Sequence, residues 1–155
     1  MSFRITGLDP APFRSLFELD DEALAARHAR RIIALEPHSS PCRVSLDDAE
    51  PGEELLLLNF EHQPAASPFR STGPVFVRRD AVEAFDAVGE IPPALARRRL
   101  SARAYDSEGM MVEGELVDGE ASASLLSRWF GDPAIDVVHL HYAARGCFAA
   151  RAVRA

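Results

Sequence analysis

The sequence contains no lysine, so all 17 of its basic residues are arginine. They face 24 acidic residues, which gives the chain a formal net charge of −7. An acidic balance argues against general nucleic-acid binding, because a protein neutralises the phosphate backbone with a basic face. We therefore expect no nucleic-acid partner. GC-rich coding explains the arginine bias most simply, although arginine also binds carboxylates and phosphates through paired hydrogen bonds.

Cysteine is scarce and long apolar runs are missing. The chain has only Cys42 and Cys147, which is typical of a reducing compartment. Its apolar runs are short, as in Leu55 to Leu58, whereas a membrane helix requires about 20 such residues. The first residues also lack the apolar core of a signal peptide. These features predict a cytoplasmic protein that does not interact with membranes.

Length and composition indicate one globular domain over residues 1–155. A chain of 155 residues is an ordinary domain. Hydrophobic residues make up 47% of it and charged residues 26%, so intrinsic disorder is not expected. No internal repeat and no linker divides the sequence.

Apolar alternation and turn residues predict an α+β fold. We expect a mostly antiparallel β-sheet of about seven or eight strands with two to four helices packed on it, because tight turns rather than crossover helices join most neighbouring strands. The segment 61–73 contains two prolines and is expected to be a long loop. The expected strands cover residues 3–7, 30–35, 53–60, 74–79, 99–105, 110–117, 135–142 and 147–153. The expected helical segments cover residues 10–17, 20–28, 81–88, 92–97 and 119–130.

Four segments of the chain resemble a family of small bacterial proteins. They are residues 41–46 (PCRVSL), 50–59 (EPGEELLLLN), 73–78 (GPVFVR) and 144–151 (ARGCFAAR). The combination is similar to the domain-of-unknown-function family 1203. The resemblance implies a stand-alone domain of about this length. It implies no known activity, and therefore no catalytic roles to transfer.

Two turn segments place cysteine beside arginine, at Cys42-Arg43 and Arg145-Gly146-Cys147. A neighbouring guanidinium lowers the pKa of a thiol and turns it into a nucleophile. The alternative is that each cysteine is a small buried apolar residue. We take Cys42 and Cys147 as catalytic candidates, with His62 as the candidate base. If the two cysteines lay within about 7 Å they could also form a disulfide, which nothing in the sequence requires.

Hydrogen-bonding side chains gather after the most apolar strand. Asn59, His62, Arg70 and Ser71 lie in or beside the expected loop, where they could line a pocket for a small anion. Together with Arg43 and Arg145 they form the predicted ligand-binding set. The alternative is a solvated surface loop. The cluster Arg97-Arg98-Arg99 is interpreted as solvated or ion-paired surface.

His139 and His141 alternate on an expected strand, so both rings point to the same face. They could ligate a metal if His62 or Glu61 supplied a third group. Two ligands without a spaced third are a weak zinc signal, so we predict no metal site and leave the cofactor open. An even-numbered turn before Cys147 places this residue on the face opposite the histidines, and a three-residue turn places it on the same face.

The sequence has no glycine-rich phosphate loop, Gly-x-Ser-x-Gly elbow, His-Glu-x-x-His motif or Cys-x-x-Cys motif. The first hypothesis is therefore a binding domain or enzyme with an arginine, cysteine and histidine pocket for a small anionic ligand. The alternative is a homodimeric interaction module without chemistry, in which strand edges pair. A metal-dependent enzyme built on His139 and His141 is the third.

Overall fold

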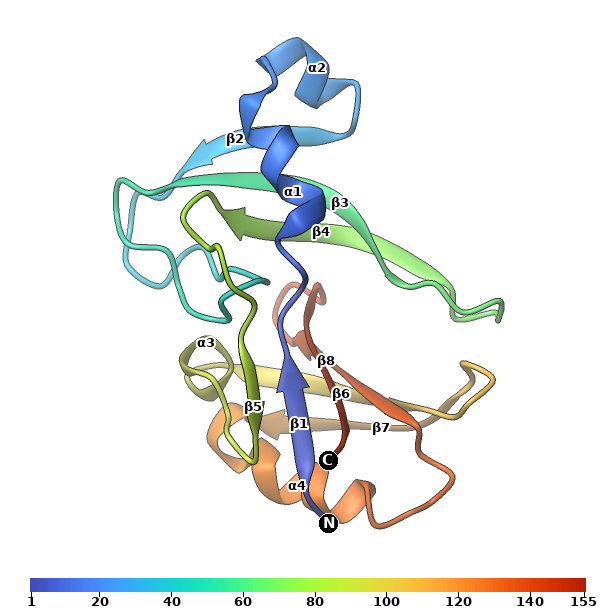
Figure 1. Cartoon of the computed structure of the whole chain (residues 1–155). Helices are drawn as coiled ribbons and strands as arrows, with labels where there is room; N and C mark the ends of the chain where they lie inside the picture. The colour runs from blue at the N-terminus through green and yellow to red at the C-terminus, as the bar shows by residue number, and fades with distance from the viewer.

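The computed structural model describes all 155 residues and divides nine strands between two antiparallel sheets (Figure 1). The larger sheet has the order β5-β1-β9-β8-β6-β7, and the smaller has the order β2-β3-β4. The strands of the larger sheet are β1 (Phe3–Thr6), β5 (Asp86–Val88), β6 (Arg99–Tyr105), β7 (Met111–Asp118), β8 (Val137–Tyr142) and β9 (Phe148–Arg154). Those of the smaller sheet are β2 (Ala29–Ile33), β3 (Glu54–Gln63) and β4 (Ser71–Arg78).

The helices are short, with four to eight residues each. They are α1 (Ala11–Arg14), α2 (Asp21–Ala25), α3 (Pro93–Ala96) and α4 (Ser122–Trp129), with 3₁₀ turns η1 (Ser15–Glu18) and η2 (Gly119–Ala121). The helices α1 and α2 accompany the small sheet, whereas α4 lies beside the large one (Figure 1). The apolar side chains Leu125, Leu126 and Trp129 of α4 are buried. No helix of the structure is long and apolar enough to cross a membrane.

Each sheet has its own hydrophobic core. In the first, Leu126, Trp129 and Phe130 pack with side chains of the large sheet such as Leu100 and Leu140. The second surrounds the small sheet and the helices beside it. Phe148 belongs to the second core although it lies on β9 of the large sheet. A side chain of one sheet therefore packs in the core of the other.

The segment between β2 and β3 runs between the two sheets. The amide of Arg43 donates to the carbonyl of Phe76 on β4 at 2.9 Å, and its carbonyl accepts from the amide of Leu8, just after β1, at 2.8 Å. On the opposite side, the loop between β3 and β4 contacts the turn between β6 and β7. There the Ser67 hydroxyl donates to the Gly109 carbonyl at 2.8 Å. The small sheet is thus held to the large one on both sides.

The antiparallel α+β class is confirmed, and two details of the expectation are wrong. Residues 86–88 form β5 rather than part of a helical turn, which raises the strand number to nine. The strands β3 and β4 extend further than expected, so the loop between them covers only residues 64–70. His62 therefore lies on a strand. Pro74 pairs with Asn59 within β4, and β4 is an edge strand, where a missing amide donor is tolerated.

Candidate functional site

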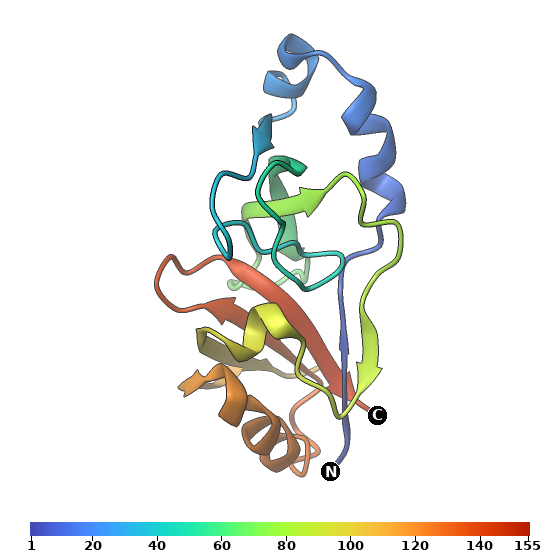
Figure 2. The same cartoon turned by 90° about the vertical axis from the view of Figure 1, so that its left-hand side faces the viewer.

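A cavity of about 460 Å³ lies where the segment between β2 and β3 meets the turn between β8 and β9. Figure 2 shows these two segments next to each other at the edge of the molecule. We call this space the arginine cavity, because four arginines contribute to its wall. It is lined by His38, Ser39, Pro41, Arg43, Phe76, Arg98, Arg99, Tyr142, Ala143, Ala144, Arg145 and Cys147.

Arg43 is almost fully buried, with 2% of its surface exposed. Its Nε donates to the Phe148 carbonyl at 2.7 Å, and its Nη1 donates to the Pro41 carbonyl at 2.6 Å. No carboxylate pairs with it, so its charge is met by two backbone carbonyls, the face of the Tyr142 ring and the Cys147 thiol. Burial lowers the pKa of this guanidinium, and nearby Tyr142 opposes that shift. The cavity wall therefore carries a buried positive charge without a counterion.

Tyr142 supplies a second unsatisfied polar group. It ends β8, its ring lies 4.9 Å from the Arg43 guanidinium carbon and 5.2 Å from that of Arg98, and its hydroxyl is buried without a hydrogen-bond partner. Burial raises the pKa of the phenol to about 12, against the opposing effect of the two arginines. The hydroxyl therefore stays protonated at neutral pH and can donate a hydrogen bond.

The remaining arginines differ in how they are paired. Arg98 binds the Asp48 carboxylate through two nitrogens at 2.5 and 3.1 Å, so its charge is neutralised locally. Arg99 and Arg145 are exposed and form no ion pair in the structure. The cavity is consequently electropositive although the chain as a whole carries a charge of −7.

The turn between β8 and β9 sorts side chains onto two faces. The amide of Tyr142 donates to the Cys147 carbonyl at 2.9 Å, which leaves residues 143–146, an even number, in the turn. This is the arrangement that separates Cys147 from the histidines: Tyr142 and Cys147 line the cavity, whereas His141 faces the opposite way. A bulge between Leu140 and His141 then pairs His141 with Phe148 rather than with Ala149.

The structure brings three of the predicted residues to one place. Arg43, Arg145 and Cys147 all line the arginine cavity. Cys42 does not, because its side chain is completely buried in the core of the small sheet. Its sulfur accepts the backbone amides of Val44 at 3.4 Å and Arg78 at 3.3 Å. Both cysteines are free, so the disulfide considered above does not form.

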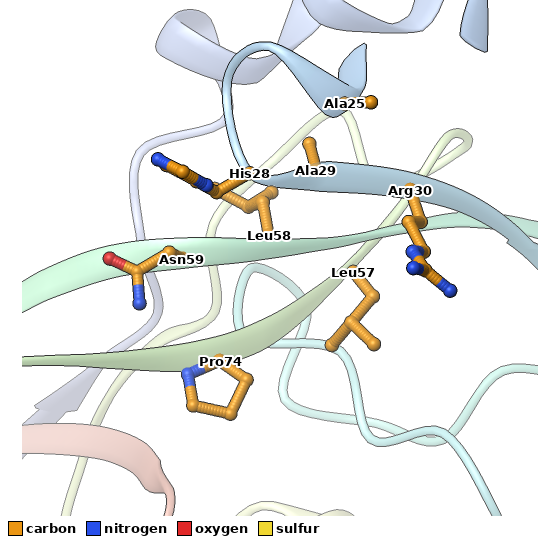
Figure 3. A pocket seen from close by; sticks show the side chains of 8 residues that line it. All are labelled: Ala25, His28, Ala29, Arg30, Leu57, Leu58, Asn59 and Pro74. Atoms are coloured by element: carbon orange, nitrogen blue, oxygen red, sulfur yellow. The ribbon is translucent and has the colours of Figure 1, made fainter. Parts of the chain in front are cut away.

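Three other predicted residues lie elsewhere. Asn59 is exposed beside His28 and Pro74, over a separate hollow along β2, β3 and β4 (Figure 3). Arg70 is exposed and pairs with the Glu61 carboxylate at 3.1 Å. The Ser71 hydroxyl donates to the Phe69 carbonyl at 2.7 Å, which is a local turn contact. The expected pocket in the β3–β4 loop is therefore not assembled by these residues.

His62 also lies outside the arginine cavity. Its ring points from β3 toward the large sheet, where the ring centroid lies 5.1 Å from that of His141 and 6.3 Å from that of His139. It thus joins a second cluster between the sheets. Only Cys147 of the three catalytic candidates reaches the cavity.

Sequence reasoning missed Arg98, Arg99 and Tyr142 as cavity residues. The ion pairing expected for the arginine cluster is present at Arg98, but the same side chain also lines the cavity. Tyr142 could have been found from the alternation of β8, because it must face away from His139 and His141. Which segment covered that face was not visible in the sequence.

The fold and the cavity define the chain as an antiparallel α+β protein with an electropositive site between two sheets. The family model described as "Protein of unknown function (DUF1203)" matches residues 39–154, and the chain belongs to this family. The match includes every residue that lines the arginine cavity except His38. No curated protein and no solved structure matches the chain.

Proposed function

We propose that this protein binds a small anionic molecule, bearing a carboxylate or phosphate group, in the arginine cavity. The observation that carries this proposal is the burial of Arg43 without a counterion beside an open cavity. A buried charge is costly unless it is paired, and removing its partner leaves that cost unrelieved. An anion in the cavity would supply the missing partner.

The other groups of the wall suit the same ligand. The Tyr142 hydroxyl is a donor without an acceptor, and anion oxygens accept hydrogen bonds. Arg99 and Arg145 add two positive charges that no carboxylate of the chain neutralises. A volume of about 460 Å³ lies within the usual range for small-molecule sites, so the ligand is larger than a bare phosphate or acetate ion.

The observations support binding, and we assign no reaction to the site. Cys147 is a half-buried free thiol in the wall, and a ligand in the cavity would cover it. We keep the cytoplasm as the expected location, because free thiols persist in a reducing compartment.

The test is a thermal-shift and calorimetric screen of the wild-type protein against organic carboxylates and phosphate esters. A ligand at 100 times its dissociation constant stabilises the folded state by about 2.7 kcal/mol. For a domain of this length that raises the melting temperature by about 5–10 °C. Arg145→Ala is expected to weaken binding about tenfold, because it removes one exposed charge from the wall and no internal contact.

Arg14→Ala is the matched control. Arg14 is also exposed and unpaired, but it lies on α1, away from the arginine cavity. Equal loss of affinity in the two variants would indicate a general charge effect. If no carboxylate or phosphate shifts the melting temperature, the proposed function is wrong.

A further inference from the structure

Three histidines from two sheets converge in the space beside Phe148. His62 comes from β3 of the small sheet, and His139 and His141 come from β8 of the large sheet. Each offers a ring nitrogen, and these nitrogens all lie within 4.8 Å of one another. The Phe148 ring stacks on His62 with a centroid distance of 5.3 Å and an interplanar angle of 8°. The chain thus places three of its five histidines at one point.

The hydrogen bonds leave these rings unsatisfied. Each of the three has one buried ring nitrogen without any hydrogen-bond partner: Nδ1 of His62, Nδ1 of His139 and Nε2 of His141. For His141 the protonation state follows from its other nitrogen. Nδ1 lies 2.9 Å from the Gly146 carbonyl, which can only accept, so Nδ1 carries the hydrogen and the buried Nε2 keeps its lone pair.

We propose that His62, His139 and His141 bind a divalent transition metal ion, with Zn²⁺ as the first candidate. Three neutral imidazoles form an established zinc ligand set. Their nitrogens would lie about 3.3 Å apart around zinc, given Zn–N bonds of about 2.0–2.1 Å. With separations of up to 4.8 Å in the structure, the nitrogens would have to approach one another by up to about 1.5 Å. The contact between His141 and the Gly146 carbonyl is the kind of second bond that orients metal-binding histidines.

The register of the sheet places two arginines at the side of this site. His139 pairs with Arg103 on β6 and with Arg151 on β9, so all three side chains leave the same face of the sheet. The two positive charges disfavour a bare cation and favour an anion in the fourth coordination position, such as hydroxide, chloride or a carboxylate. Three protein ligands leave that position open.

This site is separate from the arginine cavity, because none of its three histidines lines that cavity. Metal binding can therefore be tested whether or not the anion is found. The protein, prepared without a histidine tag and stripped with a chelator, is titrated with Zn²⁺ by calorimetry and with Co²⁺ by visible absorption. We expect one equivalent of metal per chain and a Co²⁺ spectrum of low coordination number. X-ray absorption of the zinc form should show three imidazole ligands.

His62→Gln is the principal variant, because His62 is only half-buried and its loss is tolerated more easily than that of His139 or His141. The affinity for zinc is expected to fall at least about 100-fold. His28→Gln is the matched control, since His28 is exposed and lies outside the cluster. It should bind zinc as the wild type does.

Two results would overturn the metal site. One is the absence of stoichiometric zinc binding to the wild type, in which case the three histidines only pack around Phe148. The other is equal binding by wild type and a folded His62→Gln variant, which would place the metal at surface histidines. If His62→Gln does not fold, the imidazole count from X-ray absorption of the wild type decides the question.

Discussion

Arg43 and Tyr142 illustrate how a single buried group can point to a ligand. Both are almost fully buried beside the same cavity: the Tyr142 hydroxyl has no hydrogen-bond partner, and the Arg43 guanidinium has no carboxylate partner. Buried polar groups in folded proteins nearly always have partners, so an unused donor next to open space suggests that the partner is a separate molecule. The presence of both groups at the same cavity is what supports a ligand, because a single buried polar group without a partner is not unusual in a folded protein.

Substitution of Tyr142 by phenylalanine tests this interpretation. The change removes a hydroxyl that has no partner in the free protein, so the free energy of unfolding without ligand should stay the same or rise by up to about 1 kcal/mol. Binding of the anion should weaken about fivefold to tenfold, since one hydrogen bond contributes about 1 kcal/mol. Urea unfolding with and without ligand measures both effects.

Tyr105→Phe is the matched control for that substitution. Tyr105 is equally buried, but its hydroxyl lies beside the Gln63 side chain, which supplies a hydrogen-bond partner. We expect this variant to lose about 1 kcal/mol of stability and to keep its affinity for the anion. A comparable loss of stability in Tyr142→Phe would mean that the Tyr142 hydroxyl already has a partner, contrary to our interpretation.

At the scale of elements, the segment that carries Arg43 depends on a close approach to the end of β1. Gly7 follows β1, and a Cβ atom at this position would lie 1.9 Å from the Val44 carbonyl oxygen. The same carbonyl accepts the amide of Phe85 at 2.8 Å, and the Phe85 carbonyl in turn accepts the amide of Gly7 at 2.8 Å. The backbone of residues 43 and 44 is therefore fixed between β1 and the residues before β5. Glycine is needed here for space.

Gly7→Ala should displace this segment. We expect a loss of stability of at least about 2 kcal/mol, because the clash is with a backbone carbonyl that is already hydrogen-bonded to the amide of Phe85. Binding of the anion should weaken as well, since Arg43 moves with Val44. Gly114→Ala is the control. Gly114 lies on the edge strand β7, and the nearest atom to a Cβ at this position would be 3.9 Å away. The free energy of unfolding of this variant should differ from that of the wild type by no more than about 0.5 kcal/mol. Similar effects in the two variants would contradict this account.

The strands also show how much of the structure could be predicted from the sequence. Alternation and turn residues located β6, β7, β8 and β9 to within about two residues, because each of these strands pairs with a neighbour across a short connection or buries a periodic face. The three residues of β5 gave no such signal. They pair with β1, which lies about 82 positions away along the chain, as in the strand partners Ile5 and Ala87. The division of the strands into two sheets depends on contacts between residues that are this far apart along the chain.

The residues of the candidate site could be named from the sequence, but their positions depend on contacts between distant segments. Cys42 and Arg43 are adjacent in sequence but lie in opposite environments, because their segment runs between the two sheets and Cys42 packs in the core of the small sheet while Arg43 lines the cavity. Sequence could name Arg43 and Arg145 as ligand groups, but it could not place them on one wall. His62 was assigned to a loop because two prolines follow it, so its position on β3, facing β8, was not foreseen.

At the scale of the whole molecule, the two sheets are expected to unfold together. Phe148 lies on the large sheet and packs in the core of the small one, and the segment carrying Arg43 contacts both. Neither sheet can lose its structure without exposing part of the other core. The single tryptophan, Trp129, is buried against the large sheet, so its fluorescence reports on that half alone. Far-ultraviolet circular dichroism reports on both halves.

We therefore expect the two signals to give coincident unfolding curves in urea and on heating, as a two-state transition requires. Zinc should raise both midpoints together, because His62 and the pair on β8 belong to different sheets and a shared ion would hold the sheets to each other. At 100 times its dissociation constant, zinc should add about 2.7 kcal/mol, or about 5–10 °C in melting temperature. In His62→Gln the curves should still coincide, and the same zinc concentration should add no more than about 0.4 kcal/mol. Separate transitions in the wild type would show that the sheets are independent units, and a zinc response confined to one signal would mean that the ion does not bridge them.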